Sequence, residues 1–366
     1  MDDKVMISGC WSIENPDRGE NLDPETHLIT GGEVWFDSAT GRSEWRTVRR
    51  DSKGTQSTTN RTGMVSQTVS GGYQVRFAGG EIAFFILNSN GSLSRVDHTG
   101  MTRENRLTLT KITDDLADAP SPTPGILFNT MPKSGSIYIL RSLSLGLGLM
   151  EMKVAVSLFP NDLVLRDRLD ELAWGNAIAQ QHLPASDINL RFIGARLPAM
   201  VVHVRDPRQA TVSWLHHLQN FNNHRKTIPA TEFGLEGTTP ALPENYFSWS
   251  DQKQMDWLLD THFIQLVAWA AAWTEAERKA GKPRILITLY EDFLVDRDAV
   301  FKSILKFLDI PEQRFDWAAL PQKSPQTHFR KGMADEWRDV LTGDQQKRAR
   351  DAIPRALAER FDWPLD

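Results

Sequence analysis

The chain has 366 residues, a mass of 41.4 kDa and a formal charge of −5 at pH 7. This length exceeds that of a usual single domain of roughly 100–200 residues, so two domains are expected. Lys and Arg number 42 against 47 for Asp and Glu, and no long run of like charge occurs. The balance argues against a general nucleic-acid-binding or membrane-surface protein. Because Cys10 is the single cysteine, an intrachain disulfide and a cysteine-based zinc site are excluded.

The first residues lack the basic end and the apolar core of a secretory signal. No later stretch approaches the ~18 apolar residues that cross a membrane as a helix. We therefore expect a soluble, cytoplasmic protein that has neither a membrane nor a nucleic acid as its partner.

Residues 1–116 have the pattern of an all-β region of unknown role. Short apolar and β-branched runs are separated by Gly, Asn, Asp and Ser turns, and no convincing helical pattern interrupts them. The spacing predicts an antiparallel meander closed into a small barrel. The expected strands are Glu33–Phe36, Ser43–Arg49, Val65–Val69, Tyr73–Phe77, Ile82–Leu87, Leu93–Asp97 and Arg106–Ile112.

Residues 117–125 contain three prolines among small residues and are typical of a stiff linker. In the region that follows, 126–366, buried strands alternate with helical patterns, which predicts an α/β domain with a parallel sheet flanked by helices. The expected strands are Ile126–Asn129, Met200–Val204 and Arg284–Tyr290. The expected helices lie near 136–150, 161–181, 208–220, 255–280 and 296–308.

The strand at Ile126–Asn129 runs into Pro132-Lys133-Ser134-Gly135-Ser136, and a leucine-rich helical pattern follows directly. Backbone N–H groups at a helix start, small hydroxyl side chains and one lysine together form a cradle for an anion. The plain alternative is a helix cap followed by a surface lysine. An ATP-using kinase is disfavoured because the Gly-x-x-x-x-Gly-Lys-Ser/Thr spacing is missing.

A second segment has a strand that ends at Arg205, a turn at Pro207 and a helix that carries Ser213. Pro-Lys-Ser-Gly-Ser together with Arg-Asp-Pro-Arg and the later serine resembles the signature pair of the sulfotransferases that use 3′-phosphoadenylyl sulfate (PAPS). Three further strings are similar to that family and occur in the expected order. They are Gln181-His182-Leu183-Pro184, Leu289-Tyr290-Glu291-Asp292 and Phe329-Arg330-Lys331-Gly332.

The resemblance implies a P-loop-like, three-layer catalytic domain that moves a sulfuryl group from PAPS to a hydroxyl, leaving the product PAP. His182 would be the catalytic base, and Lys133 would neutralise the bridging oxygen as the donor leaves. Tyr138 stands where the family usually has a tryptophan that stacks on adenine. The donor-binding residues that the resemblance implies are Lys133, Ser134, Gly135, Ser136, Ile137, Tyr138, Arg205, Ser213, Tyr290, Arg330, Lys331 and Gly332.

We expect the acceptor to be a small molecule, because the segment 221–256 that would cover it is rich in aromatic residues. No metal is expected. Three departures from the family matter: Gln180 replaces a lysine near the catalytic histidine, Met333 replaces the glycine expected after Arg-Lys-Gly, and Leu341–Asp344 lacks the usual Thr-Val dimer string. An oligomer of another kind stays open. The alternative function is a PAP-binding or interaction protein with a degenerate sulfotransferase fold and a working β-barrel.

Overall fold

The chain divides into two compact units in a computed structural model. Unit 1 comprises Met1–Gly125, Ser144–Met152 and Asp170–Ile178, and unit 2 comprises Ile126–Leu143, Lys153–Leu169 and Ala179–Asp366. The structure describes residues 7–14, 28–37, 40–50, 56–67, 72–96, 108–113, 121–156, 159–224, 241–279, 281, 283–321 and 334–365. Part of the predicted linker, residues 117–120, therefore lies outside the described residues.

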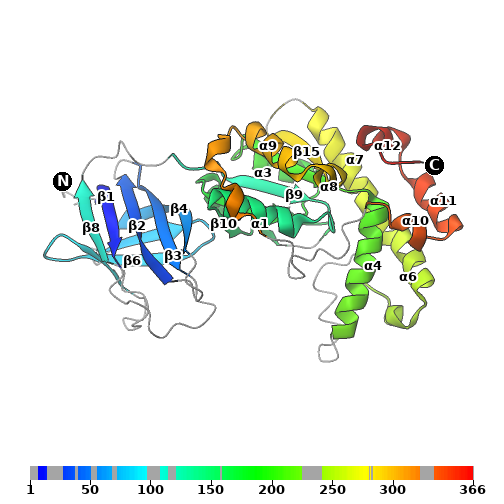
Figure 1. Ribbon diagram of the computed structural model, residues 1–366, viewed down its shortest axis with the longest axis horizontal. Helices are drawn as coiled ribbons and strands as arrows, with labels where there is room; N and C mark the ends of the chain where they lie inside the picture. Colours follow the sequence, from blue (N-terminus) through cyan, green and yellow to red (C-terminus); the bar gives the residue numbers. More distant parts are fainter. Residues whose placement is uncertain are drawn as a thin grey trace. The chain divides into compact units, whose positions relative to one another are not determined.

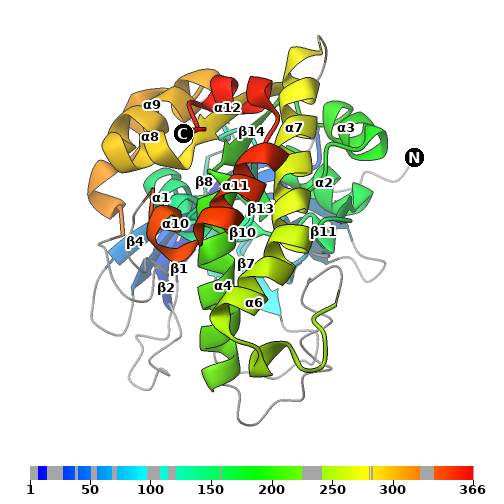
Figure 2. The same ribbon diagram turned by 90° about the vertical axis from the view of Figure 1, so that its right-hand side faces the viewer.

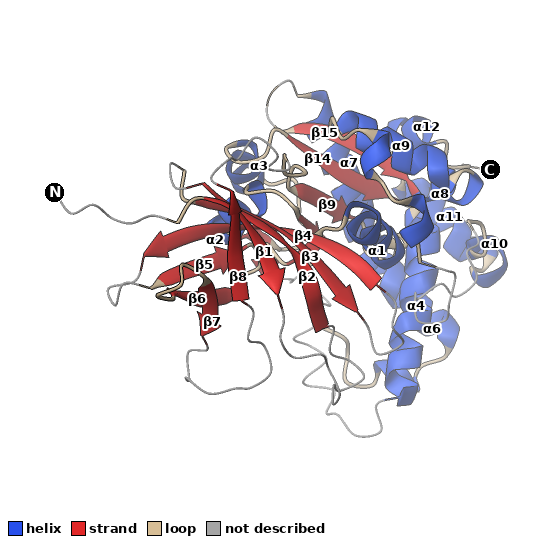
Figure 3. Cartoon of the chain, turned by 60° about the vertical axis from the view of Figure 1, so that its left-hand side comes forward, coloured by secondary structure: helices blue, strands red, loops and turns tan. Residues whose placement is uncertain are grey.

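Unit 1 contains a closed eight-stranded barrel in which each strand pairs with its neighbour in the sequence and β1 pairs with β8 (Figure 3). The predicted meander barrel is confirmed. The first strand, which carries Cys10 and Trp11, was not among the predicted runs. The strands are β1 (Gly9–Glu14), β2 (Leu28–Asp37), β3 (Arg42–Arg50), β4 (Gln56–Gln67), β5 (Tyr73–Phe77), β6 (Ile82–Leu87), β7 (Leu93–Val96) and β8 (Thr108–Thr113).

The barrel interior is filled by aromatic side chains. Trp45 is 4% exposed, and its ring lies 5.8 Å from Phe36, 5.2 Å from Phe77 and 5.6 Å from Phe85. Its indole N–H donates to Ser43 Oγ at 2.9 Å, so the polar edge of this buried ring is satisfied. Alternation along each strand sends such residues inward and explains the period-two pattern of the sequence.

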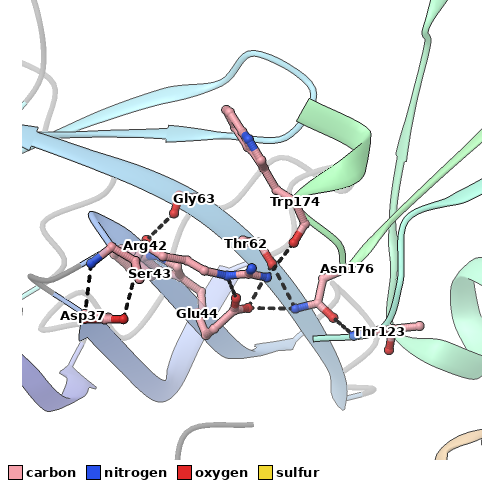
Figure 4. A network of polar contacts seen from close by, with 11 residues as sticks. Asp37, Arg42, Ser43, Glu44, Thr62, Gly63, Thr123, Trp174 and Asn176 are labelled. Atoms are coloured by element: carbon pink, nitrogen blue, oxygen red, sulfur yellow. Dashed lines mark hydrogen bonds and ion pairs between the residues drawn. The ribbon is translucent and has the colours of Figure 1, made fainter. Parts of the chain in front are cut away.

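A buried polar network completes unit 1 (Figure 4). Asn176 Nδ2 donates to Glu44 Oε2 at 2.9 Å and to Thr62 Oγ1 at 3.1 Å, and Thr123 N donates to Asn176 Oδ1 at 2.9 Å. Arg42 bridges Glu44 at 2.6 Å and the Trp174 carbonyl at 2.5 Å. Barrel strands and the segment 170–178 are thus joined inside one unit by satisfied buried groups.

The second sheet has the order β10-β13-β9-β14-β15. Strand β14 runs parallel to both of its neighbours, with Val201 opposite Phe128 and Val202 opposite Ile287. Every residue of β9, β13 and β14 is buried, which explains their nearly continuous apolar runs. The strands are β10 (Met150–Met152), β13 (Ala177–Gln181), β9 (Ile126–Thr130), β14 (Ala199–Val204) and β15 (Arg284–Leu289); β11 (Ala155–Val156) and β12 (Leu163–Val164) form a separate pair.

Helices flank this sheet (Figures 1 and 2) and confirm the predicted parallel α/β fold. A π-helical turn, Leu259–Phe263, connects α6 to α7 where one long helix was predicted. The helices are α1 (Ser136–Leu147), α2 (Arg166–Ala173), α3 (Asp187–Gly194), α4 (Pro207–His224), α6 (Asp251–Leu258), α7 (Ile264–Arg278), α8 (Tyr290–Val295), α9 (Arg297–Phe307), α10 (Trp337–Val340), α11 (Gly343–Ala352) and α12 (Arg355–Phe361). None of the described helices is long and apolar enough to cross a membrane.

The helix predicted over 161–181 is wrong in its second half. Helix α2 ends at Ala173, and the next residues, Gly175 and Asn176, have positive φ angles of 96° and 51°. Left-handed backbone ends a helix. The chain then continues as β13, whose five residues are buried within the sheet. Because a short apolar run fits a buried strand and a helix equally well, periodicity did not separate the two.

Candidate active site

The loop between β9 and α1 is held in an unusual backbone conformation. Lys133 has φ +64° and Gly135 has φ +78°, and both values lie in the left-handed region. For a lysine this region costs roughly 1–2 kcal/mol. Ser134 is fully buried, and its Oγ donates to the Met131 carbonyl at 2.7 Å. The first N–H groups of α1, which begins at Ser136, therefore lie directly after a tightly fixed turn.

Arg205 and Tyr290 fix this loop from two neighbouring strand ends. Arg205 Nη1 donates to the Lys133 carbonyl at 2.7 Å, and its guanidinium lies 3.9 Å from the centre of the Tyr290 ring. Tyr290 in turn approaches Gly135 so closely that a Cβ at that position would lie 2.9 Å from a ring carbon. Three of the five motifs found in the sequence thus meet at the carboxyl edge of the parallel sheet, where nucleotide sites occur in such folds.

His203 contacts the same loop and is a packed core residue. It is fully buried on β14, where Nε2–H donates to the Ser134 carbonyl at 3.1 Å. Its Nδ1 accepts from the Thr288 hydroxyl at 2.8 Å. Burial lowers the pKa of His203 to about 3, so this imidazole stays neutral and serves as a spacer between strand and loop.

His182 follows β13 and lies beside the strand that leads into the loop. Its Nδ1 is 2.6 Å from the Thr130 carbonyl, which can only accept, so Nδ1 carries the hydrogen and Nε2 carries the lone pair. Burial, with the charges of Lys153 and Lys133, lowers the pKa of His182 to about 4. The imidazole is therefore neutral at physiological pH and oriented to accept a proton at Nε2.

Lys153 is a residue of this site that the sequence did not indicate. Its Nζ lies 3.5 Å from the Gln180 carbonyl, and its charge acts on His182. Gln180 stands where the family resemblance implies a lysine, and its amide nitrogen contacts Thr130 Oγ1 at 2.8 Å and His182 Nε2 at 3.4 Å. A cation thus remains near His182, but it comes from a residue 27 positions before Gln180, a separation that no motif records.

The Tyr138 side chain points into the protein. The ring is 3% exposed and packs edge-on against Phe293 at 5.8 Å. Its hydroxyl donates to the Pro321 carbonyl at 3.2 Å and accepts from Arg297 Nη1 at 3.2 Å. On the same helix, Ser136 is 8% exposed and Ile137 is 37% exposed, so these two predicted donor residues differ in how much of their surface is available.

The other residues predicted to bind PAPS are Ser213 and the segment Arg330-Lys331-Gly332. Among the described residues, Ser213 on α4 shares no hydrogen bond with Arg205 or with the loop, and it is half-buried. Arg330, Lys331 and Gly332 lie outside the described residues. Arg208 has a structural role: it forms a fully buried ion pair with Asp206 at 2.6 Å and donates to the Pro364 carbonyl at 2.6 Å.

Glu291 adds a titratable group beside Arg205. Its Oε1 accepts from the Asp206 N–H at 3.1 Å. Burial raises the pKa of Glu291 to about 7, and the nearby Asp206 carboxylate adds to the effect. The Leu-Tyr-Glu-Asp string did not indicate a role for this carboxyl, whose raised pKa marks a group that can change charge near neutral pH.

The aromatic residues of the predicted acceptor cover partly pack against one another. Tyr246 is fully buried, with Phe247 at 5.3 Å, Trp249 at 5.6 Å and Trp257 at 5.4 Å between ring centres. These rings form a small core between the Tyr246–Ser248 turn and α6. Residues 225–240 of the predicted cover, including Phe233, lie outside the described residues.

A lysine-bearing loop at a helix start, with an imidazole held in the tautomer of a base, is the arrangement of a group-transfer enzyme. Residues 124–361 match the family model of the sulfotransferase domain, which is about two thirds of the chain. The chain therefore belongs to the sulfotransferase family, and sulfuryl transfer is its general activity.

Two solved structures are similar to this chain. Mouse sulfotransferase SULT7A1 complexed with PAP has 17% identity and a TM-score of 0.44, covering 66% of this chain and 86% of that one. Retinol dehydratase in complex with androsterone and inactive cofactor PAP has 15% identity and a TM-score of 0.39, covering 77% and 90%. No curated protein sequence matches the chain.

Proposed function

We propose that the chain transfers a sulfuryl group from PAPS to the hydroxyl of a small molecule, releasing PAP and a sulfate ester. The observation that carries this proposal is the position of His182, whose Nδ1–H is bound to Thr130 while the charge of Lys133 acts on the ring. We infer that base and cation border one reaction space, as an in-line transfer requires.

In the proposed reaction, the acceptor oxygen forms a bond to sulfur while the bond from sulfur to the 5′-phosphate oxygen breaks. The electron pair of that bond stays on the phosphate oxygen, where Lys133 stabilises the developing charge. The hydroxyl proton passes to Nε2 of His182, which is neutral at pH 7 and has its lone pair there. Arg205 would bind the 3′-phosphate, because its planar group donates bidentately to such anions.

The first experiment measures turnover with labelled PAPS on a panel of phenols, sterols, aliphatic alcohols, sugars and peptides. Lys133→Ala and His182→Ala should each lose most of the turnover. PAP affinity by calorimetry should survive best in His182→Ala, because that residue acts on the acceptor. Lys302→Ala is the matched control, since Lys302 is an exposed lysine on α9 with its side chain 54% exposed.

Arg205→Ala should lose donor affinity selectively, since a charge-assisted phosphate contact contributes ~1.5–3 kcal/mol. The exposed Arg284, paired with Asp309 at 3.1 Å, provides the control Arg284→Ala. Equal affinity of the parent protein for PAP and for 5′-AMP would reject the assignment to the 3′-phosphate. If the parent protein binds PAP tightly but sulfates no acceptor, and if His182→Ala binds PAP equally well, the alternative function is favoured. In that case the chain is a PAP-binding protein in which the β-barrel is the working part.

A further inference from the structure

A second buried imidazole, His262, lies in unit 2 close to His182. It belongs to the π-helical turn Leu259–Phe263, and it is 7% exposed. Among the described residues, none forms a hydrogen bond with its Nε2. A buried nitrogen without a partner costs about 1–3 kcal/mol, so a group of this kind needs an explanation.

The surroundings of His262 connect it to the proposed reaction space. Its ring stacks on Trp214 with centres 5.0 Å apart and an angle of 20°. Phe159 contacts both imidazoles in T-shaped geometry, with ring centres 5.8 Å from His262 and 6.4 Å from His182. Phe159 is therefore an apolar neighbour shared by the two imidazole rings, and Trp214 covers one face of His262.

Electrostatics agree with this placement. Burial, with smaller contributions from His182 and Lys133, lowers the pKa of His262 to about 3. Lys133 and the two histidines are thus near enough to influence one another. At neutral pH His262 is uncharged, with one N–H donor and one nitrogen acceptor, and it suits a hydroxyl better than a cation.

The local backbone is also unusual at this point. Helices α6 and α7 would form one continuous helix if five residues between them did not adopt the wider π-helical winding. Such single π turns are rare, weaken the hydrogen-bond ladder and occur frequently at functional sites. The turn is what distinguishes the helical segment that carries His262 from the regular helices on either side.

We propose that His262 is a specificity residue for the acceptor, whose second hydroxyl it binds through Nε2 while the first hydroxyl faces His182. This inference rests on the proposed sulfotransferase reaction. The acceptor class that fits is a small aromatic or cyclic diol, since Phe159 offers apolar contact beside both imidazoles and His262 offers a neutral hydrogen bond. A site that binds a hydroxyl discriminates against the analogue without it, because its own polar group is left unpaired.

The test compares phenol with catechol, resorcinol and hydroquinone as probe acceptors. In the parent enzyme, at least one of the three diols should exceed phenol in kcat/KM by about tenfold, well above the factor of about two that a second equivalent hydroxyl supplies statistically. His262→Phe keeps the ring and removes the hydrogen bond. It should abolish the preference by raising KM for the diol, with KM for phenol unchanged.

His262→Gln retains a donor and an acceptor and should keep part of the preference. An equal fall for phenol and diol in His262→Phe would indicate a merely structural role and overturn the inference. A parent enzyme that sulfates phenol but prefers none of the diols would overturn it without any variant. PAP binding is measured alongside: a parent protein that neither binds PAP nor sulfates any probe would reject the proposed function itself, which is a separate outcome.

Discussion

Lys133 and Gly135 show how single residues determine the shape of the loop. Both have positive φ, and the intervening Ser134 is fully buried. The strained lysine is held through its carbonyl by Arg205, which also lies over Tyr290. A residue proposed to bind the 3′-phosphate therefore also fixes the backbone that carries the proposed catalytic cation, so donor binding and positioning of Lys133 are coupled.

Gly135→Ala should destabilise the protein and weaken PAP binding. The left-handed φ costs ~1–2 kcal/mol for a non-glycine residue, and the new Cβ would meet the Tyr290 ring at 2.9 Å. Displacing that ring loosens the contact with Arg205. Denaturant unfolding and a PAP titration measure the two effects.

Gly91→Ala is the control for that substitution. Its φ is +81°, similar to that of Gly135, but nothing lies within 4 Å of the added Cβ. It should show the backbone cost and leave PAP affinity unchanged. PAP affinity in Gly135→Ala equal to that of the parent would contradict the proposed link between the loop and Tyr290.

The sequence motifs indicated candidate site residues within contiguous strings and gave no indication of those outside them. Lys133, Arg205 and Tyr290 follow the ends of separate apolar strands, and parallel strands bring such ends together. Lys153 and His262 come close to His182 only through the folded chain, from positions 29 residues before it and 80 residues after it. No periodicity or short motif carries that information.

At the scale of elements, the carboxyl ends of the strands and the π-helical turn carry titratable groups. These groups have opposite effects on how the stability of the fold depends on pH. His203 and His262 have pKa values of about 3 against 6.5 in an unfolded chain, so the folded state excludes protons that the unfolded chain binds below pH 6.5. Their contribution to stability is lost as pH falls. The pKa of Glu291 is raised to about 7, so the folded protein binds this proton more tightly than the unfolded chain does. The stability that Glu291 contributes is therefore lost as pH rises from 4.5 to 7.

We expect two variants to change the pH dependence in opposite directions between pH 4.5 and 6.5. In His262→Gln the unfolding free energy should fall less steeply with decreasing pH, by ~1.4 kcal/mol per pH unit. The reason is that the variant lacks one imidazole that stays unprotonated in the fold and is protonated in the unfolded chain. Glu291→Gln should steepen it, because the compensating proton uptake disappears. Urea unfolding at pH 6.5, 5.5 and 4.5 gives the slopes. Slopes that move in the same direction in both variants would contradict the assigned pKa shifts.

The expected helix over 161–181 shows what element prediction lacks. Residues 177–181, Ala-Ile-Ala-Gln-Gln, fit either a helix or a buried strand, and the tertiary sheet decides. In contrast, β5 and β6 were predicted with their observed bounds, because alternation on a half-buried sheet is a local signal. The fully buried β9 and β14 were also predicted, so the prediction failed where a buried strand contains two glutamines and not wherever burial is complete.

At the scale of the whole molecule, unit 1 is assembled from three stretches of the chain. Residues 144–152 and 170–178 fall within the range that matches the sulfotransferase domain, yet they pack with the barrel strands in one unit. The buried carboxyl of Glu44 joins the barrel to residues 170–178 through its hydrogen bond from Asn176. Burial raises its pKa, while Arg42, Thr62 and Asn176 stabilise the ionised form.

Asn176→Asp should destabilise the protein by ~1–3 kcal/mol at pH 8 and by less at pH 5. The variant replaces an amide donor 2.9 Å from Glu44 Oε2 by a second carboxylate, so the folded pair takes up a proton more readily than the unfolded chain. A raised folded pKa gives stability that is lost as pH rises. Asn90→Asp, at an exposed turn of the same unit, is the control. Equal destabilisation at both pH values would contradict the charge argument.

Unit 1 is built from separate stretches of the chain, and the ribosome synthesises these stretches at different times. Glu44 and Asn176 are 132 residues apart, and Arg76 pairs with Glu171 across 95 residues. At a synthesis rate of about 5–20 residues per second, the barrel strands emerge roughly 5–25 s before these partners exist. The nascent barrel keeps Arg42 and Thr62 beside Glu44 but lacks Asn176 and Glu171, so its completion is tied to the synthesis of residues 170–178.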